Sequence, residues 1–211
     1  LGGLNGQGMA QIEAFYETVD LMLVAGSRLR GHETMDCSVP LPKTRAQIDV
    51  DPLADGRTYA NSCFVLGDAG VTLEAFATRI AGKMAIDPCF GEEFRTLKRR
   101  ARAAFRATLG PYADFADQLR AVMPKDAIWA RDITINNSTW GNKLFPLHHP
   151  SSNIYPVGAG IGQGLCLGIG AALAPGGRKV VVMTGDGGFF LNLTELWTAV
   201  QENLDLTILV M

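Results

Sequence analysis

The sequence predicts an α/β protein built from two units, each with a parallel sheet. Three observations carry this prediction: short apolar runs bounded by turn residues, helical periodicity between those runs, and a Gly-rich segment followed by a strand and a Gly-Asp-Gly turn. Strands that alternate with helices pair in parallel, because each helix carries the chain back along the sheet. A length of 211 residues, 47% of them hydrophobic and 19% charged, suffices for two modest cores.

Composition and charge exclude several classes of function. A formal net charge of −2 argues against a nucleic-acid partner, and the basic cluster at residues 98–102 falls on the polar face of a helix expected over residues 92–109. The four cysteines are widely spaced, which argues against a disulfide framework or zinc site and favours a cytoplasmic location. No apolar run approaches the roughly 20 residues of a membrane helix, so no membrane partner is expected.

The first unit is expected over residues 1–83, followed by a connecting segment over residues 84–110. Within the first unit we expect strands over residues 20–26, 45–51 and 64–68 and helices over residues 11–18 and 71–80. Pro88 and Pro111 punctuate the connection, because proline disfavours the interior of a helix.

The second unit is expected over residues 111–211. Its elements in order are a helix over residues 112–123, a strand over 127–131, a polar loop, a Gly-rich helix, a strand over 180–183, a helix and a strand over 206–211. Asn192 followed by Glu195 fits a capping box, which predicts the start of the helix before the final strand.

Asp186 is the first candidate site residue. It lies between Gly185 and Gly187, where a β-branched strand ends, and ligands of open α/β sheets bind outside the carboxyl ends of the strands. The glycines, together with Gly188, can turn backbone N–H groups towards an anion. The carboxylate of Asp186 offers a hard oxygen to Mg²⁺, so the pattern predicts a site for a metal and a diphosphate.

A Gly-rich segment, residues 155–173, precedes the strand that leads to Asp186. Small residues at positions 164, 168 and 171 allow its helix to pack closely against a neighbour. The segment fails the Gly-x-Gly-x-x-Gly fingerprint in each frame, which argues against a dinucleotide site. A Gly-rich loop that serves tight packing alone is the alternative, and it stays open.

The polar loop over residues 132–141 follows the first strand of the second unit. Its residues Asn136, Asn137 and Ser138 can donate hydrogen bonds to phosphate oxygens without adding charge. The same side chains can instead cap a helix, so both interpretations stay open.

His148 and His149 invite a metal or acid–base interpretation. They stand between Pro146 and Pro150, and the sequence offers no partner ligand nearby. Adjacent histidines rarely face one ligand, so a surface loop is favoured.

Together these motifs resemble the cofactor-binding region of the thiamine diphosphate enzymes of the acetolactate synthase and 2-oxo acid decarboxylase superfamily. The resemblance rests on Gly-Asp-Gly at residues 185–187, on the Asn-x-x-Glu-Leu-x-Thr-Ala pattern at residues 192–199 and on the strand that follows. It extends over nearly the whole chain and is strongest after Met123. The family pattern closes with an Asn after that strand, so we expect the chain to be a piece of a longer protein.

The resemblance implies thiamine diphosphate and Mg²⁺ as cofactors and a 2-oxo acid as substrate of a lyase or transferase. It implies that Asp186 binds the metal and that Gly185, Gly187, Gly188, Asn136 and Asn137 lie at the cofactor. It further implies that the carbonyl of Ala159 and the N–H of Ile161 contact the aminopyrimidine ring, while the Ile161 side chain supports the bent cofactor.

The same resemblance implies a homo-oligomer, a dimer or tetramer, because the activating Glu of the family belongs to another domain on a neighbouring subunit. No residue of this chain is therefore matched to a catalytic role, and the chain alone is expected to be inactive. Residues 1–83 correspond to an incomplete middle domain and residues 111–211 to an incomplete cofactor domain. The middle domain carries FAD in acetolactate synthases, but residues 30–34 depart from the synthase pattern, which makes FAD doubtful here.

Three alternatives to a synthase-like enzyme remain. The polar loop and residues 196–201 lean towards a benzoylformate-type decarboxylase. A NAD-dependent oxidoreductase would explain Asp49 and Asp51 after a strand, yet it lacks the glycine fingerprint. A non-catalytic module is also open, because a fold does not fix a function.

Overall fold

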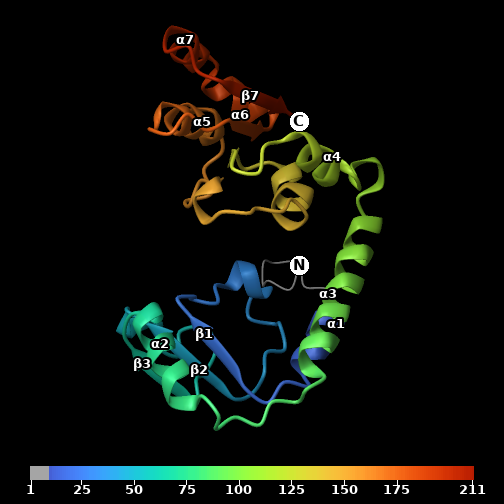
Figure 1. Ribbon diagram of the computed structural model, residues 1–211, viewed down its shortest axis with the longest axis vertical. Helices are drawn as coiled ribbons and strands as arrows, with labels where there is room; N and C mark the ends of the chain where they lie inside the picture. Colours follow the sequence, from blue (N-terminus) through green and yellow to red (C-terminus); the bar gives the residue numbers. More distant parts are fainter. Residues whose placement is uncertain (1–9) are drawn as a thin grey trace. The chain divides into compact units, whose positions relative to one another are not determined.

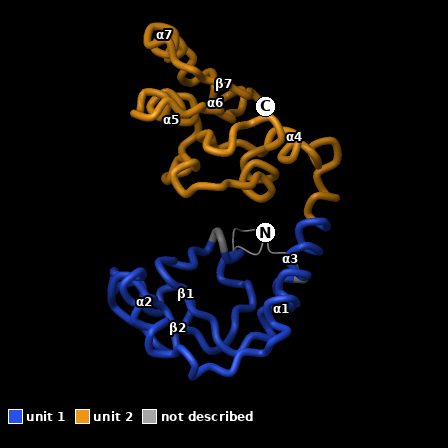
Figure 2. The backbone as a smooth tube through the Cα atoms, in the orientation of Figure 1, with its two compact units in different colours: residues 1–104 blue, residues 105–211 orange. Residues whose placement is uncertain are grey.

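The computed structural model describes residues 10–211, so residues 1–9 of the predicted first unit lie outside the description. Helices accompany a parallel sheet in each half of the chain (Figure 1). The chain divides into two compact units: unit 1 ends at Ala104, and unit 2 runs from Phe105 to Met211 (Figure 2). The predicted α/β class with two parallel sheets is therefore confirmed.

Unit 1 is built on three parallel strands in the order β1-β2-β3. The strands are β1 (Met22–Ala25), β2 (Arg45–Asp49) and β3 (Cys63–Leu66), with helices α1 (Ala10–Tyr16) and α2 (Ala69–Ile80) and 3₁₀ turns η1 (Gly31–Thr34) and η2 (Pro52–Ala54). The central strand is the most enclosed, and Ile48 is fully buried. Helix α2 begins where the carboxylate of Asp68 accepts a hydrogen bond from the N–H of Val71.

Helix α3 (Phe90–Ala107) crosses the division between the two units. Its apolar face includes the buried Ala101 and Phe105, and Phe94 packs 5.7 Å from the ring of Phe15. Its charged residues lie on the exposed side, where Glu92 pairs with two arginines, so the predicted amphipathic helix is confirmed. No helix in the described part of the chain is both long and apolar enough to cross a membrane.

Unit 2 contains four parallel strands in the order β5-β4-β6-β7. The strands are β4 (Ile128–Arg131), β5 (Asn153–Ile154), β6 (Val180–Thr184) and β7 (Leu206–Val210). The helices are α4 (Phe115–Val122), α5 (Gln163–Leu173), α6 (Asp186–Leu191) and α7 (Leu196–Gln201). Short turns complete the unit: η3 (Gly110–Tyr112), η4 (Asn137–Gly141), η5 (Pro150–Ser152) and η6 (Leu193–Glu195).

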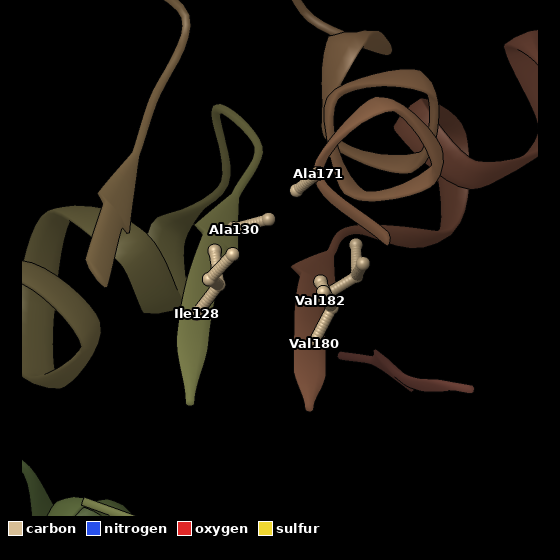
Figure 3. Close-up of a cluster of buried hydrophobic side chains, with 5 residues drawn as sticks. All are labelled: Ile128, Ala130, Ala171, Val180 and Val182. Carbon is tan, nitrogen blue, oxygen red and sulfur yellow. The ribbon is translucent and has the colours of Figure 1, made fainter. Parts of the chain in front are cut away.

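The core of unit 2 lies between helix α5 and strands β4 and β6. Figure 3 shows Ala171 of α5 beside Ala130 of β4 and Val182 of β6. The helix comes this close because it carries glycine where it meets the sheet: a Cβ added to Gly168 would lie 2.2 Å from Cγ2 of Val182. The close packing predicted from the small residues of this helix is therefore confirmed.

The opposite face of β4 is covered by aromatic rings. The Trp129 ring is fully buried and lies 4.7 Å from the ring of Phe145 and 6.0 Å from that of Trp140. Its Nε1 donates a hydrogen bond to the carbonyl of Gly141 at 3.3 Å. These contacts anchor the end of the polar loop to the centre of the sheet.

The helical turn predicted to start at Asn192 is present, because Asn192 is the N-cap residue of η6, but the predicted side-chain capping bond is wrong. Helix α6 already begins at Asp186, directly after β6, and the Asn192 side chain caps no backbone N–H of the turn that follows. Its Nδ2 instead donates to the carbonyl of Gly162, 30 residues earlier, at 2.6 Å. A long-range partner has replaced the local one that the sequence pattern favoured.

Two glycines of α5 allow a matched test of this packing. We expect Gly168→Ala to lower the free energy of unfolding by about 1–3 kcal/mol, because Val182 would have to move. Gly170→Ala in the same helix should raise it by about 0.4–1 kcal/mol, since nothing lies within 4 Å of the added Cβ. Urea unfolding of both variants measures the difference, and equal effects would contradict the packing argument.

Candidate functional site

The carboxylate of Asp132, directly after β4, is the centre of the candidate site. The residue is fully buried. Oδ1 accepts hydrogen bonds from the N–H of Ile133 at 2.7 Å and of Gly162 at 3.0 Å. Oδ2 accepts from the hydroxyl of Thr184, the last residue of β6, at 3.1 Å. One carboxylate thereby joins the ends of two neighbouring strands to the Gly-rich loop.

The Gly-rich loop before α5 is fixed at Gly162. This residue has a φ of +96°, a conformation that favours glycine, and an added Cβ would lie 2.9 Å from Cδ1 of Leu191. Two residues later, a Cβ on Gly164 would lie 2.6 Å from Cβ of Asp132. The loop is therefore held against β4 on one side and against the end of α6 on the other.

Asp186 is the first residue of α6 and lies at the carboxyl end of β6, as predicted. It is exposed, and no hydrogen bond or ion pair to its carboxylate occurs within residues 10–211. The N–H groups in the first turn of a helix have no acceptor within the helix. In α6 these N–H groups therefore lie next to the free carboxylate of Asp186 and are available to a ligand. Oxygen and N–H groups in this arrangement suit a hard cation that bridges to an anion.

The three glycines around Asp186 are not equivalent. None of them has a positive φ, because the helix starts at Asp186 and includes two of them. A Cβ on Gly188 would lie 2.6 Å from Oδ2 of Asp132, whereas a Cβ on Gly187 would meet nothing within 4 Å. A Cβ on Gly185 would lie 3.5 Å from Cβ of Thr134 in the polar loop, which is an ordinary contact distance. Close packing against Asp132 explains why position 188 is glycine, whereas packing places no such requirement on position 187.

Ala159 and Ile161 lie in the Gly-rich loop ahead of α5. Ala159 has a φ of +57°, which a residue with a Cβ adopts only at an energetic cost. Ile161 is 60% exposed, although its side chain is large and apolar. A strained backbone and an uncovered apolar side chain in one loop are features of a surface shaped for a ligand.

The polar loop forms the short helical turn η4, and its two asparagines have different surroundings. The Oδ1 of Asn136 accepts a hydrogen bond from Nε1 of Trp140 at 2.9 Å. The Oδ1 of Asn137 accepts one from Nη1 of Arg131 at 2.6 Å. Neither side chain caps η4, so the capping alternative is not realised here. In both amides the Nδ2 donors remain for other partners.

The histidines and cysteines lie away from these groups. His148 and His149 are exposed, and His149 Nδ1 accepts a hydrogen bond from the N–H of Ser151, so the predicted surface loop is confirmed. The four cysteines are free and exposed. Across residues 10–211, no three His, Cys, Asp or Glu side chains gather as a ready-made metal cluster. A cation at Asp186 would therefore complete its shell with water and ligand oxygens, as Mg²⁺ commonly does.

The structure brings most of the predicted site residues to one edge of the sheet. Gly185 to Gly188 and the polar loop lie at the carboxyl ends of β6 and β4, and Asp132 ties the Gly-rich loop to both. Asp132 itself was not among the predicted site residues. The sequence could have indicated Asp132, because it is the first acidic residue after a buried strand, just as Asp186 is.

Comparison with known proteins agrees with this site. Residues 135–211 match the family described as the C-terminal TPP binding domain of thiamine pyrophosphate enzymes. A probable 2-ketoarginine decarboxylase of Pseudomonas aeruginosa is 32% identical over 87% of this chain and 33% of its own length. Benzoylformate decarboxylase of the same organism is 29% identical over 92% of this chain and 35% of its own length.

A third relative, the large subunit of acetolactate synthase isozyme 1 of Escherichia coli, is 24% identical over the whole chain and 38% of its own length. The chain thus spans about a third of the length of these curated relatives. The predicted relationship to the thiamine diphosphate enzymes is confirmed.

The two aspartates of the site should respond differently to removal. We expect Asp132→Ala to lower the free energy of unfolding by roughly 3 kcal/mol, because buried donors from three segments lose their acceptor. Asp186→Ala should lower it by no more than about 1 kcal/mol, since only a favourable position at a helix N-terminus is lost. Denaturant unfolding without ligands checks both, and a large loss for Asp186→Ala would show a structural role.

Proposed function

We propose, from the membership of residues 135–211 in the thiamine pyrophosphate-binding domain family, that the full-length protein is a thiamine diphosphate-dependent enzyme acting on a 2-oxo acid. The observation that carries the proposal is the unpartnered carboxylate of Asp186, exposed between glycines at the carboxyl end of β6. An exposed carboxylate between glycines at the carboxyl end of a buried parallel strand lies where ligands of open α/β sheets bind, and its oxygens suit a hard cation.

Each element of the site has a role in this proposal. Asp186 would bind Mg²⁺, and the first-turn N–H groups at Gly187 and Gly188 would donate to the diphosphate. Asn136 and Asn137 would add neutral N–H donors from the polar loop. The carbonyl of Ala159 and the N–H of Ile161 would receive the aminopyrimidine ring.

Thiamine diphosphate, when bound, supplies a nucleophilic carbon and accepts the electron pair that the departing CO₂ leaves behind. The chain's own task is to hold and orient. The buried hydrogen bonds of Asp132 fix the Gly-rich loop relative to β6, so donors from both segments keep their spacing. The exposed Ile161 would cover the ring with apolar surface and exclude water.

Decarboxylation without carboligation is the first form of the activity that we propose. It is supported by the names of two relatives, a probable 2-ketoarginine decarboxylase and a benzoylformate decarboxylase, at 32% and 29% identity. Decarboxylation followed by carboligation is the second form, supported by the 24% identical acetolactate synthase over the whole chain. In both forms the carbon–carbon bond of the substrate that breaks is the one between the carboxylate and the carbonyl carbon.

The proposal extends to the organisation of the full-length protein. Residues 1–83 would be the end of a middle domain, residues 84–110 a connection and residues 111–211 the first part of the cofactor domain. A homo-oligomer in the cytoplasm fits the family expectation and the cysteine spacing. FAD is left out, because residues 30–34 depart from the synthase pattern.

Removal of the Asp186 carboxylate tests the metal role. In the full-length protein, we expect Asp186→Ala to weaken Mg²⁺-dependent binding of thiamine diphosphate by at least about a hundredfold, because the link between metal and protein is lost. Calorimetric titration measures this, with Glu202→Ala as a control at an exposed acidic residue of the same unit. An unchanged affinity of Asp186→Ala would show that the residue is only part of a turn.

Product analysis separates the two forms of the activity. With a single 2-oxo acid as substrate, we expect the full-length protein to release CO₂ and the corresponding aldehyde in equal amounts. Chromatography of the products and carbon dioxide release measure the ratio. A product that joins two substrate molecules would instead favour the synthase-like form.

A further inference from the structure

Arg131, the last residue of β4, is a buried cation without an acidic partner. It is 4% exposed, and no carboxylate forms an ion pair with it in the described part of the chain. Nη1 donates to Oδ1 of Asn137 at 2.6 Å, and Nη2 donates to Oδ1 of Asn153 at 2.8 Å. The guanidinium also lies over the ring of Tyr155, 4.9 Å from its centroid. Its Nε is enclosed and has no hydrogen-bond partner.

Such an arrangement is costly for a protein. Burial lowers the pKa of Arg131, yet a guanidinium keeps its charge in proteins, so an uncompensated charge stays inside unit 2. Two neutral amides and one aromatic ring stabilise the buried guanidinium less than a carboxylate would. A hydrophobic side chain of similar volume would fill the same space beside the ring of Tyr155 without this cost. Arg131 is therefore better explained by what it orients than by stability.

The clearest effect of Arg131 is on the amide of Asn137. Because Oδ1 is bound to the guanidinium, the Nδ2 group points to the other side of the amide. Asn137 is 3% exposed, and no partner for Nδ2 is found among residues 10–211. Nδ2 is not fully enclosed, so a small part of this nitrogen is accessible. The residue offers donors there and no acceptor.

The other contacts of Arg131 reach the Gly-rich segment. Asn153 belongs to β5, and Tyr155, two residues later, opens the segment that leads to Ala159 and Ile161. One side chain thus touches both the polar loop and the strand that enters the Gly-rich loop. A shift of either segment would break a charge-assisted hydrogen bond in a buried setting.

We infer that Arg131 is a positioning residue of the proposed site: it fixes the Asn137 amide so that only N–H donors face a bound anionic oxygen. This inference rests on the proposed function. The anionic oxygen is carried either by the diphosphate of the cofactor or by the carboxylate of the 2-oxo acid. The guanidinium does not touch the ligand, and its charge adds a favourable field for an anion at the carboxyl end of β4.

Asn137→Asp in the full-length protein separates orientation from stability. The new carboxylate would accept the same hydrogen bond and neutralise Arg131, so we expect the midpoint of thermal unfolding to stay or rise. Anion binding should fall by at least about tenfold, because acceptors replace the donors. Ile135→Asp, at an 81% exposed position of the same loop, controls for the added charge and should have the smaller effect.

Arg131→Met and Arg131→Lys complete the set. We expect Met to weaken anion binding by about tenfold, and Lys not to restore it, because one ammonium cannot hold two amide oxygens in the geometry of a planar fork. Arg131→Met and Asn137→Ala both remove the same interaction. The double variant should therefore bind the anion as well as the single variant with the larger loss, rather than show the sum of the two losses. Fluorescence of Trp140, which donates to Asn136, would report the change in the loop.

Two measurements identify the anion. If the Asn137 and Arg131 variants bind thiamine diphosphate with Mg²⁺ more weakly, the anionic oxygen belongs to the diphosphate. If their KM for the 2-oxo acid rises at unchanged cofactor affinity, the anionic oxygen belongs to the substrate. If the wild type binds the cofactor and Asn137→Asp, folded, leaves both constants unchanged, the inference is overturned while the proposed function stands. Full restoration by Arg131→Lys, or additive losses in the double variant, would also overturn it. A wild type that does not bind thiamine diphosphate overturns both.

Discussion

A buried carboxylate needs donors for its lone pairs, and the requirement of Asp132 organises the candidate site. Its donors come from its own loop, from Gly162 and from Thr184, which belong to three different segments. None of these segments can withdraw without leaving a charge unsolvated in the interior. The polar loop, the Gly-rich loop and the end of β6 therefore keep one arrangement, and α6 starts from a fixed point.

The alternation of side chains along β4 gives adjacent residues opposite tasks. Asp132 shares a face with Ala130 and meets α5 at Gly164. Arg131 shares the other face with Trp129, and its guanidinium contacts Asn137, Asn153 and Tyr155. From the end of one strand, Asp132 therefore holds the Gly-rich loop on one face of the sheet, and Arg131 holds the polar loop on the other. They do not pair: Asp132 accepts hydrogen bonds from three donors, whereas Arg131 donates to two amide oxygens and keeps an unpartnered Nε. This separation lets the sheet fix the loops on both of its faces at once.

The sequence predicted the strands and the main helices because their patterns are local. Val180 to Thr184 is buried throughout and β-branched except at Met183, and α3 has one apolar face. It also located Asp186 at the carboxyl end of β6, because a lone acid between glycines follows such a strand. It failed at Asn192, whose partner Gly162 lies 30 residues away, and it left Asn137 open between two roles, because only the fold brings Arg131 beside it. Sequence patterns report neighbours along the chain, while these side chains are set by neighbours in space.

The different surroundings of the glycines bear on how the Gly-Asp-Gly-Gly signature should persist among relatives. Gly188 and Gly164 leave no room for a Cβ beside Asp132, so folding alone would conserve them. A descendant that had abandoned the cofactor would keep these glycines and still look like a member of the family. Asp186 contributes to the fold only through its favourable position in the first turn of α6, so folding alone would conserve it weakly. If Asp186 binds the metal as proposed, the acid, rather than the glycines, is the position that would distinguish a working relative from one that has lost the cofactor.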